Sequence, residues 1–222
     1  MIEIAIDGPA ASGKGALGKK LSDKYNFPYL DTGILYRKVA YELIKNNIKN
    51  SKNLEILCCD FAKNLNLKEF KNKNLRTEDV AKLASKIAIF PNLRKILNNK
   101  QKEFSNFNKK QFGGCILDGR DIGTTILPNA DFKFFITASI EVRAKRRLLQ
   151  KNISFLHEND EKCMLQTLIN DMKERDKLDS NRKTSPLVPA KDAHVIDTTI
   201  INSQELLLIV TNIIEGKNEL LK

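Results

Sequence analysis

Short apolar runs alternate with helix-length amphipathic segments along the chain. Residues 2–6 form a β-branched run that stops before a Gly-Pro pair, which predicts a strand followed by a turn. A helix is expected over 14–25, because Leu17 and Leu21 are spaced to share one face. Other short apolar runs predict further strands over 29–31, 114–118, 132–137 and 193–197.

Helical spacing recurs between these strands. Leu35, Val39 and Leu43 predict a helix that begins at Gly33, and Ser139 is the expected N-cap of a basic helix to about residue 151. Strands that alternate with helices, several of them continuous apolar runs, are typical of a parallel sheet covered on both faces. The remaining helices are expected over 78–90, 92–107, 161–178 and 203–215, the first two separated by a proline.

The stretch 46–77 departs from this alternation. It is rich in Asn and Lys and has no long apolar pattern, so we interpret it as part of an inserted lobe. The 222 residues, 41% of them hydrophobic, suffice for one domain with such an insertion. No apolar run approaches the roughly 18 residues of a membrane span, and no secretory leader is expected.

The net charge of +11 attracts polyanions, which include nucleic acid, acidic membranes and phosphorylated small molecules. Much of the excess is Lys mixed with Asn, as on a solvated surface, so charge alone does not choose among them. None of the four cysteines forms a C-x-x-C pair. Reduced core thiols in a cytosolic protein are therefore expected, rather than a zinc site or disulfide framework.

A glycine-rich loop lies between the first predicted strand and helix. Gly8 to Lys14 match G-x-x-x-x-G-K, where glycines let successive N–H groups point at one phosphate and the lysine supplies a full charge. The alternative is a strand-to-helix turn without a ligand. Gly15 and Ala16 follow where Ser or Thr is usual, so a hydroxyl contact to phosphate is lost.

Candidate anion and metal sites follow further along the chain. Asp118 ends an apolar strand, where an acid holds Mg²⁺ in P-loop enzymes or simply caps a turn. Arg143, Arg146 and Arg147 share one helical face, which suits either a lid that clamps phosphates or a solvated basic face.

Two further segments combine Arg with Asp. Gly119 is followed by Arg120 and Asp121, which present both charges at the carboxyl edge of the sheet, where α/β proteins bind ligands. Arg175, Asp179 and Arg182 share a face if their helix persists, either as a ligand site or as a surface ion-pair set.

These segments together resemble bacterial cytidylate kinases from end to end. The motifs that carry the resemblance are Ile4 to Pro9, Leu30 to Gly33 with Tyr36-Arg37, Leu75 to Glu78, Asp118 to Thr124, Glu174 to Asp176 with Asp179-Ser180 and Arg182, and Pro186 to Ala193. The resemblance implies an α/β three-layer P-loop fold, in which helices flank a five-stranded parallel sheet. It implies one nucleoside monophosphate kinase domain over 1–222, with a core of 1–45 and 110–222, a nucleotide-binding insertion over about 46–109, and a short lid with its flanking helices over about 143–182.

The resemblance also implies a role for each matched residue. The cofactor is ATP with Mg²⁺, and Asp118 is expected to hold the metal through water. The ATP phosphates are expected at Gly8, Pro9, Ala10, Ala11, Ser12, Gly13, Lys14, Gly15 and Ala16. The CMP phosphate is expected at Thr32, Arg37, Arg120 and Arg182, the cytosine at Ser85, Arg94 and Asp121, and the ribose at Arg175 and Asp179. The catalytic charges are expected from Lys14, Arg143, Arg146, Arg147 and Arg182.

The predicted activity is transfer of the γ-phosphoryl group from ATP to CMP or dCMP, by a cytoplasmic monomer with no nucleic-acid or membrane partner. Another P-loop kinase, for AMP, UMP or a shikimate-like acid, is the nearest alternative. A nucleic-acid-binding protein is the alternative that the charge suggests, and a P-loop protein that binds nucleotide without turnover is a third.

Overall fold

The computed structural model describes the chain except for residues 49–51, 67–71, 151–156, 183 and 217–222. The chain divides into two compact units. The first comprises Met1–Tyr29 and Asn108–Lys222, and the second comprises Leu30–Phe107. The predicted partition into a core, an insertion over 46–109 and a lid stays a prediction.

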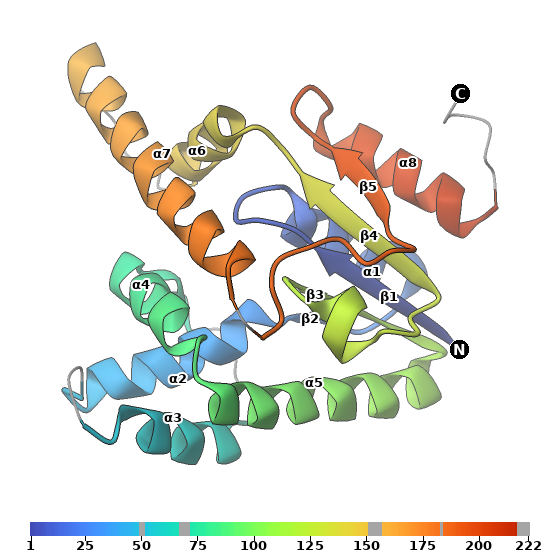
Figure 1. The fold of residues 1–222 in the computed structure, drawn as a ribbon. Coiled ribbons are helices and arrows are strands. Elements are labelled where there is room, and N and C mark those ends of the chain that lie inside the picture. Colours follow the sequence, from blue (N-terminus) through green and yellow to red (C-terminus); the bar gives the residue numbers. More distant parts are fainter. Residues whose placement is uncertain (49–51, 67–71, 151–156, 183, 217–222) are drawn as a thin grey trace. The chain divides into compact units, whose positions relative to one another are not determined.

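A five-stranded sheet confirms the predicted α/β class, and its order is β2-β3-β1-β4-β5 (Figure 1). β1 pairs in parallel with β3 and with β4, and β4 pairs in parallel with β5. In the β1–β3 register, Ile6 lies opposite Asp118 and Asp7 lies opposite Gly119. The strands are β1 Ile2–Asp7, β2 Tyr29–Asp31, β3 Gly114–Gly119, β4 Phe132–Thr137 and β5 His194–Asp197.

Apolar side chains of α1 and α8 pack against the central strands of this sheet. Leu17 and Leu21 of α1 and Leu206 of α8 share one buried cluster with Ile4 and Phe134. The predicted N-cap Ser139 accepts a hydrogen bond from the amide of Val142, and an Asn202–Glu205 capping box starts α8. The helices of this unit are α1 Lys14–Tyr25, α6 Ile140–Leu149, α7 Glu158–Ser180 and α8 Ser203–Ile214.

The second unit contains a helix that the sequence pattern did not predict. α3 buries Cys58, Cys59 and Ala62, which are small side chains that give little apolar periodicity. α5 begins at Pro91 rather than after it, because the first helical position needs no N–H donor. The elements that start in this unit after β2 are α2 Gly33–Lys45, α3 Leu54–Lys63, the 3₁₀ turn η1 Lys73–Arg76, α4 Glu78–Ile87 and α5 Pro91–Phe112.

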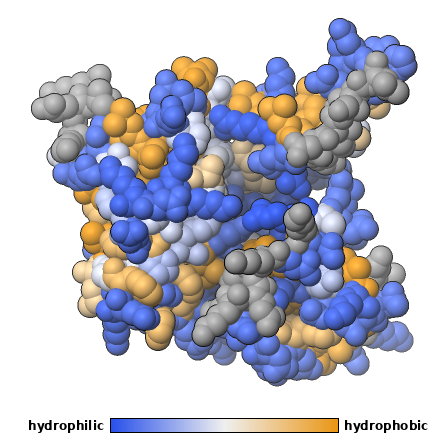
Figure 2. Space-filling view, turned by 180° about the vertical axis from the view of Figure 1, so that it is seen from behind, coloured by the Kyte–Doolittle hydropathy of each residue, from blue (hydrophilic) through white to orange (hydrophobic). Residues whose placement is uncertain are grey.

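Three cysteines, Cys58, Cys59 and Cys115, are buried thiols, as predicted. Cys163 on α7 is exposed, so the prediction of a core thiol is wrong there. Within the described residues, no helix is long and apolar enough to cross a membrane. Figure 2 shows mainly hydrophilic residues on one face of the molecule, with separate hydrophobic areas between them.

Candidate functional site

The loop between β1 and α1 has a backbone that glycine alone adopts readily at two positions. Gly8 has φ +148°, and a Cβ there would lie 2.0 Å from the carbonyl oxygen of Ile136. Gly13, which directly precedes α1, has φ +102°. Ala11 also has a positive φ, 58°, which is uncommon for a residue with a side chain. The glycines of the G-x-x-x-x-G-K motif are therefore required by the backbone conformation of this loop.

Two polar side chains of this loop fit an anionic ligand. The Nζ atom of Lys14 donates to the carbonyl oxygen of Pro9 at 3.4 Å, which places the charge across the loop. Ser12 is fully buried, and its Oγ has no hydrogen-bond partner among the described residues. Because an unpaired buried hydroxyl costs about 1–3 kcal/mol, a ligand oxygen here would relieve a penalty. The loop residues thus fit the phosphates of ATP.

Arg143 of α6 holds the phosphate loop through the backbone of that loop. Its guanidinium donates to the carbonyl oxygens of Ala10 at 3.4 Å and Ala138 at 3.0 Å. It also pairs with Asp176 of α7 at 2.7 Å. Since Arg143 is only 6% exposed, the alternative of a solvated basic face is wrong for this residue.

Arg146 makes a second link to the same loop. It donates to Ser12 O at 3.5 Å, to Thr198 Oγ1 at 2.8 Å and to Thr198 O at 2.6 Å. The Thr198 hydroxyl itself donates to Ser12 O at 2.9 Å. Burial lowers the pKa of Arg146, and the nearby Asp197 partly offsets this. Arg147 instead donates at 3.3 Å to Gln150, the residue that directly follows α6.

Sequence reasoning missed Thr198, which follows β5 and carries no motif of its own. Its only signal is its place after the carboxyl end of a parallel strand, where α/β proteins bind ligands. The phosphate loop is therefore fixed by segments far from it in sequence.

Asp118 lies beside the first turn of α1. It is 2% exposed, and its Oδ2 accepts a hydrogen bond from the Tyr29 hydroxyl at 2.8 Å. A Cβ on Gly15 would lie 3.4 Å from the same oxygen, so the carboxylate faces the phosphate loop. Asp118 therefore fits the predicted metal-side acid. Among the described residues, no group of three or more His, Cys, Asp or Glu side chains is arranged to hold a metal ion.

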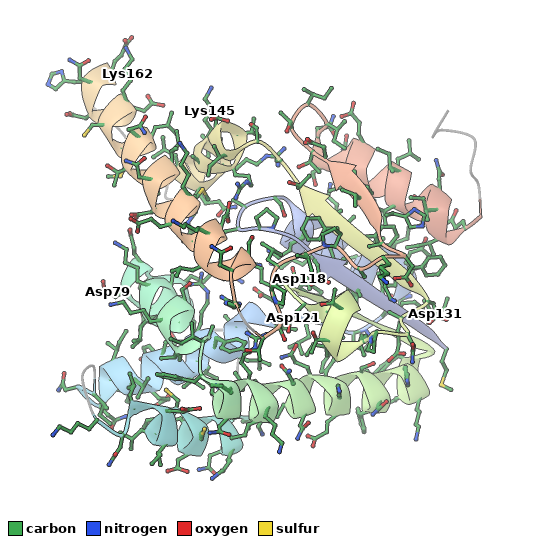
Figure 3. All side chains as sticks on the ribbon, viewed as in Figure 1. Asp79, Asp118, Asp121, Asp131, Lys145 and Lys162 are labelled. Atoms are coloured by element: carbon green, nitrogen blue, oxygen red, sulfur yellow. The ribbon has the colours of Figure 1, made fainter. Side chains whose placement is uncertain are left out.

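The turn after β3 carries Arg120 and Asp121 into a short π-helical segment, Ile122–Ile126. The amides of Ile126 and Leu127 donate to the carbonyls of Asp121 and Ile122, five residues back. Asp121 is 8% exposed, and Figure 3 shows it near Asp118 in this region. The sequence does not predict the π segment, although such segments are frequent at functional sites.

Asp179 bridges two of the predicted phosphate-binding arginines. Arg120 Nε donates to its Oδ2 at 3.0 Å, and Arg182 pairs with its Oδ1. Burial alone raises the pKa of Asp179, but the charges of Arg120, Arg182 and Arg175 outweigh it and lower the pKa. Four predicted ligand residues therefore form one charged cluster in the first unit.

Replacing Asp179 with Asn is expected to lower the free energy of unfolding by about 3 kcal/mol, because two largely buried arginines lose their counter-ion. A lowered pKa in the folded state means that this stabilisation is present above the unfolded pKa and is lost as the pH falls through the folded pKa. Urea unfolding at pH 7 measures the loss. Glu174→Gln, on the exposed side of the same helix, is the control and should change stability little.

The second unit positions the remaining predicted substrate residues. Arg37 donates to Leu75 O at 3.1 Å, and Thr32 is 5% exposed where α2 begins. Arg94 is also 5% exposed, with its guanidinium carbon 5.9 Å from the centroid of the Tyr36 ring. Ser85 Oγ is buried with no partner among the described residues, which leaves it able to bond a ligand.

The fold and this loop define a P-loop nucleotide-binding protein of the phosphotransferase class. The model of the cytidylate kinase family matches residues 4–216, and the chain belongs to this family. It is 40% identical over 214 residues to a cytidylate kinase of Bartonella tribocorum, covering 96% of this chain and 94% of the relative. It is also 40% identical over 219 residues to a cytidylate kinase of Methylocella silvestris, covering 99% and 96%.

A solved structure supports the fold. An uncharacterised protein from Eubacterium ventriosum aligns with a TM-score of 0.52 and 16% identity, covering 97% of this chain and 99% of that one. At this identity the match bears on the fold alone.

Proposed function

We propose that the protein transfers the γ-phosphoryl group of ATP to CMP, and also to dCMP, giving ADP and CDP or dCDP. One observation carries the proposal. Lys14, Asp118 and Arg120 all lie at or just beyond the carboxyl ends of the paired strands β1 and β3. The loop beside them buries the Ser12 hydroxyl without a hydrogen-bond partner among the described residues. Membership of the cytidylate kinase family favours CMP over AMP, UMP or a shikimate-like acid, and over nucleic acid.

The donor site is proposed to be the loop. The backbone of residues 8–16 binds the ATP phosphates, and Lys14 neutralises the β- and γ-phosphates. Bound Mg²⁺, held by Asp118 through water, would supply further positive charge to the transferring group. Arg143 and Arg146 contribute by holding the loop as well as by their charge, and Arg147 and Arg182 are proposed to act on the transferring phosphoryl group.

The acceptor residues are proposed from the motifs that match the family, in three groups. Thr32, Arg37, Arg120 and Arg182 bind the CMP phosphate, while Arg175 and Asp179 bind the ribose. Ser85, Arg94 and Asp121 bind cytosine, and the buried Ser85 hydroxyl, which has no partner in the part of the chain that the structure describes, supports this assignment. The CMP phosphate is itself an ionised nucleophile, so the reaction requires alignment and charge neutralisation rather than a general base. We further propose that the enzyme is a cytoplasmic monomer.

A coupled assay tests the activity directly. Purified protein with ATP and Mg²⁺ is given CMP, dCMP, UMP, AMP or shikimate in separate reactions, and ADP and the phosphorylated product are measured. We expect turnover with CMP and dCMP well above the others. Preferred turnover of another acceptor would contradict the proposed substrate, and tight ATP binding without ADP formation would contradict the proposed reaction.

Asp121→Asn is expected to relax the choice of base. Asp121 accepts from the amino group of cytosine, whereas the Asn amide also donates to the uracil carbonyl. An unpaired buried group costs about 1–3 kcal/mol, so kcat/KM for CMP should fall roughly tenfold or more relative to UMP. Asp131→Asn is the matched control, because Asp131 is exposed and its Oδ2 accepts the backbone amide of Glu3 at 2.7 Å. An unchanged CMP-to-UMP ratio in Asp121→Asn would remove the residue from the base site.

A further inference from the structure

Asp7 is a buried carboxylate that the proposed substrate contacts leave without a role. It is the last residue of β1, directly before Gly8 of the phosphate loop, and it is 4% exposed. Its Oδ1 accepts the amide of Ile122 at 2.8 Å, and its Oδ2 accepts the amide of Gly123 at 2.8 Å. Each carboxylate oxygen therefore holds one backbone amide of a segment more than a hundred residues away.

These two amides begin the π segment that follows Asp121. N–H groups in a first helical turn have no partner within the helix, so a side chain must satisfy them when they are buried. The spacing is close, because a Cβ on Gly123 would lie 3.4 Å from Asp7 Oδ2 and 3.3 Å from Lys133 Cδ. Asp7 thus fixes the backbone immediately after the residue proposed to contact cytosine.

The surroundings of Asp7 disfavour its ionised form. Burial raises its pKa to about 6, the bonds from Gly123 and Ile122 lower it, Asp121 raises it, and Arg120 lowers it. Burial and the negative charge of Asp121 both disfavour the ionised carboxylate, so Asp7 costs stability. Its bonds from the amides of Ile122 and Gly123 offset part of this cost.

We propose that Asp7 is a positioning residue that ties the phosphate loop to the turn carrying Arg120 and Asp121, and so sets discrimination between cytosine and uracil. The inference rests on the proposed function, because it assigns the base contact to Asp121. Asp7 does not touch the substrate. It acts by holding the amides of residues 122 and 123, which fixes where the Asp121 carboxylate stands.

Asp7→Asn isolates this role. Asn has nearly the same volume, but one oxygen becomes an NH₂ group that cannot accept a backbone amide. A shift of the turn by about 1 Å is enough to disturb a catalytic contact severely. We therefore expect the ratio of kcat/KM for CMP to kcat/KM for UMP to fall roughly tenfold, comparable to a lost base contact. The KM for ATP should change less than about twofold, because Arg143 and Arg146 hold the phosphate loop separately.

The matched control is Asp131→Asn, which removes a carboxylate that accepts the amide of Glu3 near the opposite end of β1. Figure 3 shows Asp131 near that end, away from Asp118 and Asp121. The control should leave the CMP-to-UMP ratio and the KM for ATP unchanged. Thermal unfolding of each variant shows whether it remains folded.

Three outcomes decide the proposal. A lower CMP-to-UMP ratio in folded Asp7→Asn supports it. An unchanged ratio, or an equal loss for both nucleotides, overturns it and leaves Asp7 a structural role only. If Asp7→Asn does not fold, Gly123→Ala keeps the donating amide but crowds the contact, because its Cβ would lie 3.4 Å from Asp7 Oδ2. It should lower the ratio, and an unchanged ratio there also overturns the proposal. Failure of the unmodified protein to phosphorylate CMP would instead contradict the proposed function.

Discussion

Lys14→Ala should reduce kcat for phosphoryl transfer to CMP by about 100- to 1,000-fold, the range for loss of one preorganised charge-stabilising group. Lys14 is the first residue of α1, and its ammonium group reaches back across the loop to Pro9. Its removal takes away the charge that we propose neutralises the β- and γ-phosphates during transfer. A coupled ADP assay with saturating CMP measures the loss.

The matched control is Lys19→Ala, which removes an exposed lysine from the same helix. It changes the net charge equally but lies beyond the first turn, so we expect kcat within about twofold of the unmodified protein. Both variants should unfold at a temperature close to that of the unmodified protein. Full activity in Lys14→Ala would mean that the loop does not bind the transferred phosphate.

Gly8→Ala should cost about 4 kcal/mol or more in the free energy of unfolding and abolish ATP binding. The added Cβ would meet the Ile136 carbonyl oxygen at 2.0 Å, and backbone of a central strand has no room to retreat. The φ of +148° adds strain for any residue with a side chain. Urea unfolding and titration with a fluorescent ATP analogue measure the two effects.

Gly113→Ala is the control that separates the cost of a positive φ from the cost of the steric clash with Ile136. Gly113 also has a positive φ, +78°, but a Cβ there meets nothing within 4 Å. We expect this control to cost about 1–2 kcal/mol from conformation alone and to leave ATP binding intact. If both variants lost the same free energy of unfolding and the same ATP binding, the clash with the Ile136 carbonyl would not explain the effect of Gly8→Ala.

Patterns that are local in sequence predicted their elements well. The strand–loop–helix unit around Gly8 to Lys14 was placed because apolar periodicity and glycine spacing coincide there. α3 was missed because its buried face consists largely of Cys and Ala, and the π segment after Asp121 has no sequence signal of its own. Tertiary packing decides both, which single-sequence periodicity does not contain.

In the candidate site too, local motifs were predicted and contacts between distant segments were not. The sequence predicted Lys14 and Asp118, because Lys14 completes the glycine-rich motif and Asp118 lies at the end of an apolar run. It did not predict that Tyr29 bonds Asp118, that Thr198 bonds the loop, or that Asp7 anchors the turn after Asp121. Each of these contacts joins residues far apart in the chain, and only the order of strands in the sheet brings them together.

The pairing of β1 with β3 has a consequence for how such a protein can vary. Ile6 stands opposite Asp118, and side chains of a strand point alternately to its two faces. A one-residue deletion within β3 would turn Asp118 to the other face and pull Arg120 back into the sheet. Substitutions that keep the strand length leave this register intact, whereas a change of length there would separate Asp118 from the phosphate loop in a single step.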